Sequence, residues 1–436
     1  MDINEARKRT ESYIDDHRDD IFGLLRRLIA IKSFTTIEGE AQRLIEAELQ
    51  KLGLATRRIV GNREALRAHP EYNCYEMPYM QALEERPNIV GNAPGSGGGR
   101  SLVLFAHIDT VPIFAPEKWT HDPFAGGIEN GRLYGRGAAD DKAGVVQNLM
   151  ALTALRGARI PLRGDLTFAS TIEEEVGGVP GIMACILDGV QGDGAFYGHP
   201  IDTGMRQLNI ANLGILTFDV HVPGFPTSPL FYVMDREEGN AIEWAAEIVL
   251  ALRQLGVERR KRVSCDIYDR LYGNATCICP SVARIKGSGY YLATPEACVV
   301  TATAQYPPGE REEDVKQEIS AAVERVAQGD PWLRRNPPRI VWGDIRFTPS
   351  QVPETDDIVT LSKRAIESYT GSAPIVSGIP TGSDIRFFNN YTKTPAISFG
   401  ATGANFHGAD EWLDMEEYLS TIKATAAFIM SWCGVG

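Results

Sequence analysis

The chain has 436 residues. A single hydrophobic core stops growing at roughly 250–300 residues, so we expect two domains. Hydrophobic residues make up 43% and charged residues 23%, as in an ordinary globular protein, and the net charge of −13 argues against a nucleic acid or an anionic membrane as the main partner.

The N-terminal segment lacks the apolar stretch of a secretory signal, and no stretch reaches the about 18 apolar residues of a membrane span. We therefore expect a cytoplasmic protein with no membrane partner. The seven cysteines are odd in number and scattered, which favours free thiols. The spacing of Cys277 and Cys279 does not fit the usual two-residue metal or redox motif, so we interpret them as structural residues.

The first half of the chain alternates between helical and extended patterns. Residues 4–31 carry apolar side chains at helical spacing, which predicts one long first helix, and a second helix is predicted over residues 38–52. Strands are predicted at 88–91 and 101–106. The Gly-rich run 94–99 between them leads into a strand and not a helix, so we interpret it as a flexible hairpin and not as a phosphate-binding loop.

A helix at 141–156 and a strand at 166–171 continue this alternation, which predicts an α/β fold with a mostly parallel, mixed sheet and helices on both faces. From residue 211 to 346 the predicted order becomes β-α-β-β-α-β, which is typical of an α+β ferredoxin-like module. We therefore predict a larger α/β domain formed by residues 1–210 and 347–436, and a smaller domain inserted over residues 211–346.

The first candidate site residues follow an apolar strand that ends at His107 and continues to Asp109. Open α/β sheets place their sites at the C-terminal ends of strands. Side chains two residues apart in an extended chain point the same way, so His107 and Asp109 can face one site. A metal-bound imidazole usually has an orienting carboxylate, and Asp109 suits that position; a purely structural pair is the alternative.

Three further clusters carry metal-ligand chemistry. Asp140 follows a Gly-rich turn where a helix starts, so its two oxygens can bridge two cations or simply cap the helix. Three glutamates, 173–175, directly follow a buried-type strand, and adjacent side chains point to opposite sides. One of them can bind a metal while the next acts as a general base, unless the turn is merely acidic and solvated. His199 and His407 lie in loops after strand-like stretches.

In this order and spacing the motifs resemble the family of acetylornithine deacetylase, succinyl-diaminopimelate desuccinylase, aminoacylase and bacterial glutamate carboxypeptidase. The resemblance covers nearly the whole chain and includes Trp119, the run 131–137 and the run 382–386. It implies that residues 1–210 and 347–436 form a zinc-peptidase-like catalytic domain and that residues 211–346 form a lid or dimerisation domain. It also implies a homodimer or larger assembly through this lid, and two divalent metal ions. Zinc is the first expectation, with manganese or cobalt as alternatives.

The resemblance also implies the metal ligands. Asp140 would bridge the two ions, His107 would hold one ion and His407 the other, and Glu175 would be a further ligand. His199 stands where many members of the family have an acid before a proline. Relatives of the β-alanine synthase type have histidine there, so we expect His199 to bind metal.

The same resemblance makes Glu174 the general base and Asp109 the support of His107. A neutral histidine at position 199 in place of a carboxylate makes the centre one unit more positive. Such a centre should acidify its water more strongly and should attract a small, anionic substrate.

The chain departs from the family in the lid. Members of the family usually carry three functional residues in the lid: a histidine, an arginine that binds a substrate carboxylate, and an asparagine. In this chain the matching stretch 224–228 has no histidine. Gln305 stands at the position of the arginine, and Leu292 stands at the position of the asparagine. These departures favour a C–N bond in a small, non-peptidic substrate. One relative of this type removes an amino group from 5-nitroanthranilate, and hydrolytic deamination of such an aromatic amine is our specific expectation.

Two alternatives stay open. One is the ordinary family reaction, deacylation of an N-acyl amino acid or hydrolysis of a dipeptide or a C-terminal residue. The other is a non-catalytic, metal-dependent binding protein. Glu174 argues against the second alternative, because a pure binder has no use for a base beside the metal.

Overall fold

The computed structural model describes residues 1–72, 81–228, 239–273 and 280–436. The chain forms two compact units. The first contains Met1–Ala211, Gln351–Gly378 and Ser383–Gly436, and the second contains Asn212–Ser350 and Ile379–Gly382. Cys74, Cys277 and Cys279 lie outside the described residues, and the remaining four cysteines are free thiols. No helix among the described residues is long and apolar enough to cross a membrane.

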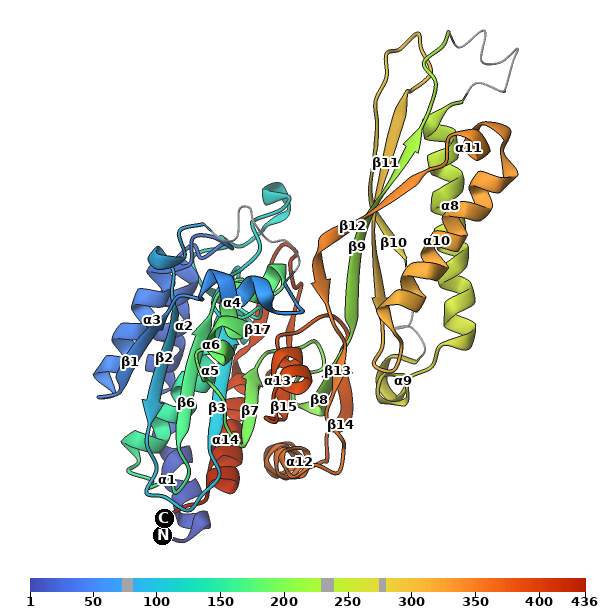
Figure 1. Ribbon diagram of the computed structural model, residues 1–436. Coiled ribbons are helices and arrows are strands. Elements are labelled where there is room, and N and C mark those ends of the chain that lie inside the picture. The colour runs from blue at the N-terminus through green and yellow to red at the C-terminus, as the bar shows by residue number, and fades with distance from the viewer. Residues whose placement is uncertain (73–80, 229–238, 274–279) are drawn as a thin grey trace. The chain divides into compact units, whose positions relative to one another are not determined.

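A nine-stranded mixed sheet organises the first unit (Figure 1). Its strands follow the order β1 (Ala55–Ile59), β2 (Asn88–Ala93), β6 (Leu166–Thr171), β3 (Leu102–His107), β7 (Gly194–Gly198), β15 (Ala396–Phe399), β8 (Gln207–Asn212) and β13 (Ser350–Gln351), and β14 (Ile375–Ile379) also pairs with β8. The central strands β6, β3, β7 and β15 are parallel, whereas β1, β2 and β8 run antiparallel to their neighbours. This arrangement confirms the predicted α/β fold with a mixed sheet.

The helices of this unit are α1 (Ile3–Asp16), α2 (Arg18–Ala30), α3 (Gly39–Lys51), α4 (Arg63–Ala68), α5 (Lys142–Gly157), α6 (Ala184–Leu187), α12 (Asp357–Thr370), α13 (Ile385–Tyr391) and α14 (Met415–Cys433). They cover both faces of the sheet, as adjacent residues of β7 show. Phe196 packs toward Phe428 of α14, with ring centroids 5.8 Å apart, whereas Tyr197 stacks on Phe105, which contacts Phe388 of α13 at 5.1 Å. Neighbouring side chains of a strand point to opposite faces, so α13 and α14 lie on opposite sides.

The predicted single helix over residues 4–31 is wrong. The segment forms α1 and α2, with a break at His17, where φ is −111° and ψ is 23°. The imidazole Nδ1 of His17 lies 2.8 Å from the carbonyl oxygen of Tyr13, and the His17 ring stacks on the Tyr13 ring at 3.9 Å. Apolar residues of both helices are buried, so the helical spacing continues through the break and does not reveal it.

The predicted hairpin around the Gly-rich run 94–99 is also wrong. Strands β2 and β3 are not neighbours, because β6 lies between them and pairs with both. The run instead packs on other backbone segments, and a Cβ atom at Gly95 or Gly99 would collide with the backbone of residues 163–164. Close backbone approach, and not a tight turn, explains these glycines.

The second unit is a four-stranded antiparallel sheet with two long helices on one of its faces (Figure 1). In chain order its main elements are β9 (Gly214–Pro223), α8 (Ala241–Arg262), β10 (Ser281–Gly287), β11 (Ala297–Tyr306), α10 (Glu312–Gly329) and β12 (Arg339–Phe347), with the short helices α9 (Asp266–Tyr272) and α11 (Pro331–Arg335). The strand order β10-β11-β9-β12 and the β-α-β-β-α-β sequence confirm the predicted ferredoxin-like module. Alternate residues of β9 are buried against the helices, as a one-sided sheet requires.

A small sheet in the first unit joins two loops that are far apart in sequence. Its strands follow the order β16 (Gly403–Ala404), β17 (Trp412–Asp414), β5 (Arg132–Tyr134) and β4 (Gly127–Glu129). The pairing of β17 with β5 aligns Leu413 with Leu133. The loop before β17 carries His407 and the loop after β5 carries Asp140, so this pairing brings the two loops together.

Candidate metal centre

Most of the candidate site residues lie at one edge of the large sheet. His107 ends β3, the 3₁₀ turn η3 (Glu174–Val176) follows β6, and His199 follows β7. These three strands are adjacent and parallel, so their C-terminal ends meet at the same edge, where open α/β sheets place their sites. Asp140 and His407 arrive from the two loops joined by the small sheet.

Asp140 lies at the centre of the cluster. Its Oδ1 atom lies 3.1 Å from Nε2 of His107 and 3.3 Å from Nε2 of His199. Its Oδ2 atom lies 3.2 Å from Nε2 of His407, which lies 2.9 Å from Oε2 of Glu175. The two oxygens of one carboxylate therefore face two separate pairs of side chains.

The described residues contain two groups whose ligand atoms lie within 4.8 Å of one another: one is His107, Asp141 and His199, and the other is Asp140, Glu175 and His407. The structure thus brings together all five residues predicted as metal ligands. Asp141 is an addition that the sequence analysis missed. Its Oδ1 atom caps helix α5 by accepting the N–H of Gly144 at 3.1 Å, while its Oδ2 atom is buried and has no hydrogen-bond partner among the described residues.

These residues fit two divalent cations. Imidazole nitrogens and carboxylate oxygens are the ligands that zinc, manganese and cobalt take from proteins. Two of the carboxylate oxygens, Oδ2 of Asp141 and Oε1 of Glu175, are buried and unpartnered, which is costly unless a cation is nearby. Burial raises the pKa of Asp141 to about 8 and also raises the pKa of Glu175. The excess of buried carboxylates therefore calls for positive charge.

The histidines respond to the same carboxylates. Burial opposes the charge of His199, but Asp141 and Asp140 outweigh burial and raise the pKa of His199 to about 9. Burial likewise opposes ionisation of Asp140, yet its contacts with the three histidines hold its pKa well below the ordinary range. Protons on the histidines and metal ions at the same positions are alternative ways to balance this charge.

Glu174 lies beside the two groups and belongs to neither. Its Oε2 atom is 4.0 Å from Nε2 of His107, and its side chain is 13% exposed. Burial raises the pKa of Glu174 well above its ordinary value; His107 opposes this rise, and the negative charges of Asp384 and Glu175 add to it. A carboxyl group that holds a proton readily and lies next to the ligands is suited to proton transfer.

Asp109 is buried behind this turn and has several partners. Its Oδ1 atom lies 3.3 Å from Nδ1 of His107 and accepts the backbone N–H of Glu174 at 3.1 Å. Its Oδ2 atom accepts the backbone N–H of Glu175 at 3.2 Å. The carboxylate predicted to support one histidine therefore also holds the turn that carries both glutamates.

Glu411 and Arg136 are buried residues that the sequence analysis gave no role. The Oε1 atom of Glu411 accepts the backbone N–H groups of Ala139 and Asp140 at 2.8 and 2.9 Å, and Oε2 forms an ion pair with Arg136. Glu411 is 271 residues away from Asp140 in the sequence. No local pattern predicts such a contact, although Arg136 lies within the run 131–137 that the sequence analysis singled out.

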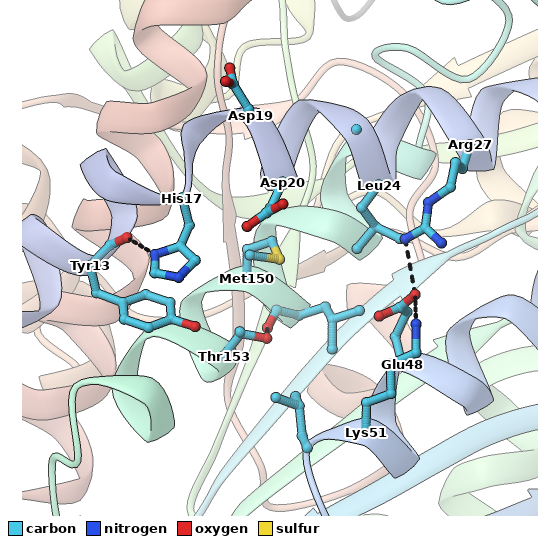
Figure 2. Close-up of a pocket in the computed structure, with 13 residues that line it drawn as sticks. Tyr13, His17, Asp19, Asp20, Leu24, Arg27, Glu48, Lys51, Met150 and Thr153 are labelled. Atoms are coloured by element: carbon cyan, nitrogen blue, oxygen red, sulfur yellow. Dashed lines mark hydrogen bonds and ion pairs between the residues drawn. The ribbon is translucent and has the colours of Figure 1, made fainter.

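A separate cavity of about 550 Å³ lies in the first unit among α1, α2, α3 and α5 (Figure 2). Figure 2 shows Arg27 and Lys51 both reaching Glu48, at 3.0 and 2.9 Å. No member of the two ligand groups lines this cavity, so it is distinct from the candidate metal centre.

The fold and this centre define a metal-dependent hydrolase with a site for two ions. Residues 103–431 match the model of peptidase family M20/M25/M40, which is more than half of the chain. The chain therefore belongs to this family of dinuclear metallohydrolases, which confirms the resemblance drawn from the motifs. Family membership also identifies an enzyme that acts on C–N bonds and argues against the non-catalytic alternative.

Two relatives share sequence over much of the chain. The chain is 27% identical over 443 residues to an N-formyl-4-amino-5-aminomethyl-2-methylpyrimidine deformylase of Halalkalibacterium halodurans, covering 97% of this chain and 96% of the relative. It is 27% identical over 368 residues to the deformylase of the same name in Bacillus subtilis, covering 80% and 83%.

Solved structures share the fold at lower identity. Human carnosine dipeptidase 1 superposes with a TM-score of 0.74 at 17% identity, covering 98% of this chain and 99% of that chain. The dipeptidase Dug1p from Saccharomyces cerevisiae gives a TM-score of 0.78 at 14% identity, with the same coverage. At these identities the likeness describes the fold and not the substrate.

Proposed function

We propose that this enzyme hydrolyses the amide C–N bond of a small, non-peptidic N-acyl amine, and that an N-formyl aminomethylpyrimidine is the first substrate to test. The observation that carries the proposal is the similarity to the Halalkalibacterium halodurans deformylase, which extends over nearly the full length of both chains. The absence of the lid histidine and of the lid arginine, at whose position Gln305 stands, supports a substrate that is not a peptide.

We assign two divalent ions, zinc first, to the candidate centre. His107, His199 and Oδ1 of Asp140 would hold one ion, and His407, Glu175 and Oδ2 of Asp140 would hold the other. Distances of 2.9–3.3 Å among these atoms support this assignment. When bound, the two ions would lower the pKa of a water molecule and polarise the substrate carbonyl.

Glu174 would be the general base. It would accept a proton from the attacking water and return that proton to the leaving nitrogen, so that the amine departs neutral. Its position beside His107 and its raised pKa both support this role. Asp109 would act through other residues, by orienting the His107 ring and the Glu173–Glu174–Glu175 turn.

A panel of substrates tests the proposal. The zinc-loaded enzyme is offered the N-formyl aminomethylpyrimidine, an N-acetyl amino acid, a dipeptide and 5-nitroanthranilate, and released formate, acetate, amino acid and ammonia are measured separately. We expect formate release with the highest kcat/KM. Rapid turnover of the acyl amino acid or the dipeptide, without formate release from the pyrimidine, would refute the proposal and restore the ordinary family reaction.

Hydrolytic deamination of an aromatic amine such as 5-nitroanthranilate is the second candidate. Deamination has no amide carbonyl to hold, which suits the absence of the lid groups in the stretch 224–228 and at Gln305. A centre with His199 in place of a carboxylate would also favour such an anionic substrate. Ammonia release from 5-nitroanthranilate, with no formate release from the pyrimidine, would select this candidate.

We also propose that two copies pair through the second unit. Strand β10 is at the edge of its sheet, and nearly all of its residues are exposed, including Ile285 at 48%. Helix α8 beside it exposes Ile242, Leu250 and Val257. An edge strand carries unpaired backbone N–H and C=O groups, so it is a template for pairing with another strand. Light scattering should show a dimer that Ile285→Lys converts to a monomer, whereas Ile128→Lys on β4 should leave it dimeric.

A further inference from the structure

The turn that carries Glu174 and Glu175 is held at both ends by buried arginines. At its start, Arg86 forms an ion pair with Glu173 and lies 3.2 Å from Oε2 of Glu38. At its end, Arg386 donates to the backbone carbonyl of Gly177 at 2.6 Å. Both guanidinium groups are almost completely shielded from solvent, so these contacts form in a low-dielectric interior.

At the start of the turn, the backbone is in an unfavourable conformation. Glu173 has a φ of 65°, in the left-handed region that a residue with a side chain rarely adopts. Such a conformation persists only where surrounding contacts hold it. Glu173 is fully buried, and its side chain forms an ion pair with Arg86. Arg86 therefore fixes the residue immediately before the proposed base.

The other partner of Arg86 belongs to the same network. Glu38 accepts the backbone N–H of Thr36 at 3.0 Å, and the neighbouring Thr35 hydroxyl donates to Oδ2 of Asp109 at 3.3 Å. Asp109 in turn accepts the backbone N–H groups of Glu174 and Glu175. Arg86 thus reaches the turn along two routes, directly through Glu173 and indirectly through Glu38.

At the end of the turn, Arg386 is itself fixed. It lies 3.3 Å from Oδ1 of Asp384 and 3.4 Å from Oε2 of Glu71. A Cβ atom at Gly178 would collide with Oδ1 of Asp384, so the backbone passes directly against this ion pair. The planar guanidinium donates to Gly177 and pairs with Asp384 at once, which a lysine ammonium does with poorer geometry.

We propose that Arg86 and Arg386 are positioning residues that hold Glu174 at His107 and Glu175 at His407, and so govern the rate of the chemical step and the affinity for metal. The inference rests on the proposed roles of Glu174 and Glu175. A base must lie within hydrogen-bond reach of the proton it takes, and a displacement of about 1 Å can cost on the order of 10²-fold in rate.

The test uses Arg86→Lys and Arg386→Lys in the full chain. With the N-formyl aminomethylpyrimidine as substrate, we expect kcat to fall on the order of 10²-fold while KM changes little. Zinc affinity, measured by competition with a chelator and independently of any substrate, should fall about 10–100-fold. Circular dichroism should show that both variants remain folded.

Arg259→Lys is the matched control. Arg259 is also a buried arginine held by two glutamates, Glu310 and Glu318, at 2.6 and 2.7 Å, but it lies in the second unit. We expect it to lower thermal stability without changing zinc affinity or kcat. If Arg259→Lys lowers zinc affinity and kcat as much as Arg86→Lys does, the arginines act only through stability and the inference is overturned.

Two further variants keep the inference testable. If Arg86→Lys does not fold, the triple variant Arg86→Met/Glu38→Gln/Glu173→Gln removes all three charges together, which a protein tolerates better than an unpaired buried charge. Normal zinc affinity and kcat in that variant would overturn the inference. If Glu174→Gln is inactive while the arginine variants are fully active, the positioning role is refuted and the proposed base is not. If Glu174→Gln is active, the proposed role of Glu174 as the base is refuted.

Discussion

The carboxylate of Asp109 accepts the backbone N–H of Glu174 at 3.1 Å, and the same Oδ1 atom lies 3.3 Å from Nδ1 of His107. One buried side chain therefore couples the orientation of a proposed metal ligand to the position of the proposed base. Partners of this kind commonly affect metal affinity and activity nearly as much as the ligands themselves.

Replacing Asp109 with asparagine should reduce both properties. The amide nitrogen cannot accept a hydrogen bond, so the backbone N–H of Glu174 or of Glu175 loses its acceptor, whereas Nδ1 of His107 keeps the backbone carbonyl of Asp109 at 3.0 Å. We expect zinc affinity and kcat each to fall about 10–100-fold. Asp193→Asn is the control, because Asp193 also accepts a backbone N–H, from Ser101 at 2.8 Å, at the opposite end of β3. Equal losses in both variants would contradict the role of Asp109.

Glu174→Gln should separate proton transfer from structure. The amide is nearly isosteric but cannot take a proton, so kcat should fall about 10²–10⁴-fold while the metal content and the melting temperature are kept. Steady-state kinetics, elemental analysis and thermal denaturation of the same preparation measure kcat, the metal content and the melting temperature. Glu117→Gln, an exposed residue outside the site, should leave both unchanged. A Glu174→Gln enzyme with a near-normal rate would show that another group is the base.

Glu411→Gln should destabilise the fold more than an ordinary surface change. It leaves Arg136 buried and without a carboxylate partner, which typically costs about 3–5 kcal/mol. It also weakens the acceptor for the N–H groups of Ala139 and Asp140, so the loop that carries Asp140 should loosen. Chemical denaturation measures the free energy of unfolding. The exposed pair of Glu416 with Arg18 provides a control, and Glu416→Gln should change stability by less than about 1 kcal/mol.

Acid should weaken the second unit through Glu312. Burial opposes ionisation of Glu312, but its ion pairs with Lys316 and Arg346 outweigh burial and lower its pKa. A lowered folded-state pKa contributes stability that is present above the unfolded value of about 4.3 and is lost as pH falls through the folded value. Glu312→Gln should therefore be less stable than the unmodified protein at pH 7, by about 1–3 kcal/mol, and this difference should shrink below pH 4.

Hydrogen exchange of peptides from α10 and β12 measures this effect within the second unit. Glu313→Gln, which changes an exposed neighbour on α10, should show no such difference. A Glu312→Gln difference that stays constant down to pH 3 would contradict the assigned ion pairs.

Local patterns predicted the features that depend on neighbouring residues. His107 ends the fully buried parallel strand β3, and the glutamates 173–175 follow the mostly buried strand β6, so each cluster could be placed at a strand end. Strand alternation also predicted the one-sided sheet of the second unit. Asp141 was missed as a member of a ligand group because an aspartate at a helix start is typical of a cap, and the sequence does not show that its side chain also lies beside His107 and His199.

Long-range pairings could not be predicted in the same way. The position of β6 between β2 and β3 depends on which strands pair, which the spacing of apolar residues does not encode. The contacts of Arg86 with Glu173 and of Glu411 with Asp140 join segments that are 87 and 271 residues apart. A buried arginine or glutamate reads in the sequence like any exposed one, and only its three-dimensional partner reveals its role.

The most direct test of the central claim is the number of divalent ions bound per chain in the purified enzyme, measured by elemental analysis against amino-acid analysis. We predict two ions per chain, and one or fewer in His407→Ala, with activity lost on chelation and restored by zinc. Full activity in a preparation that holds no stoichiometric divalent ion would contradict the account.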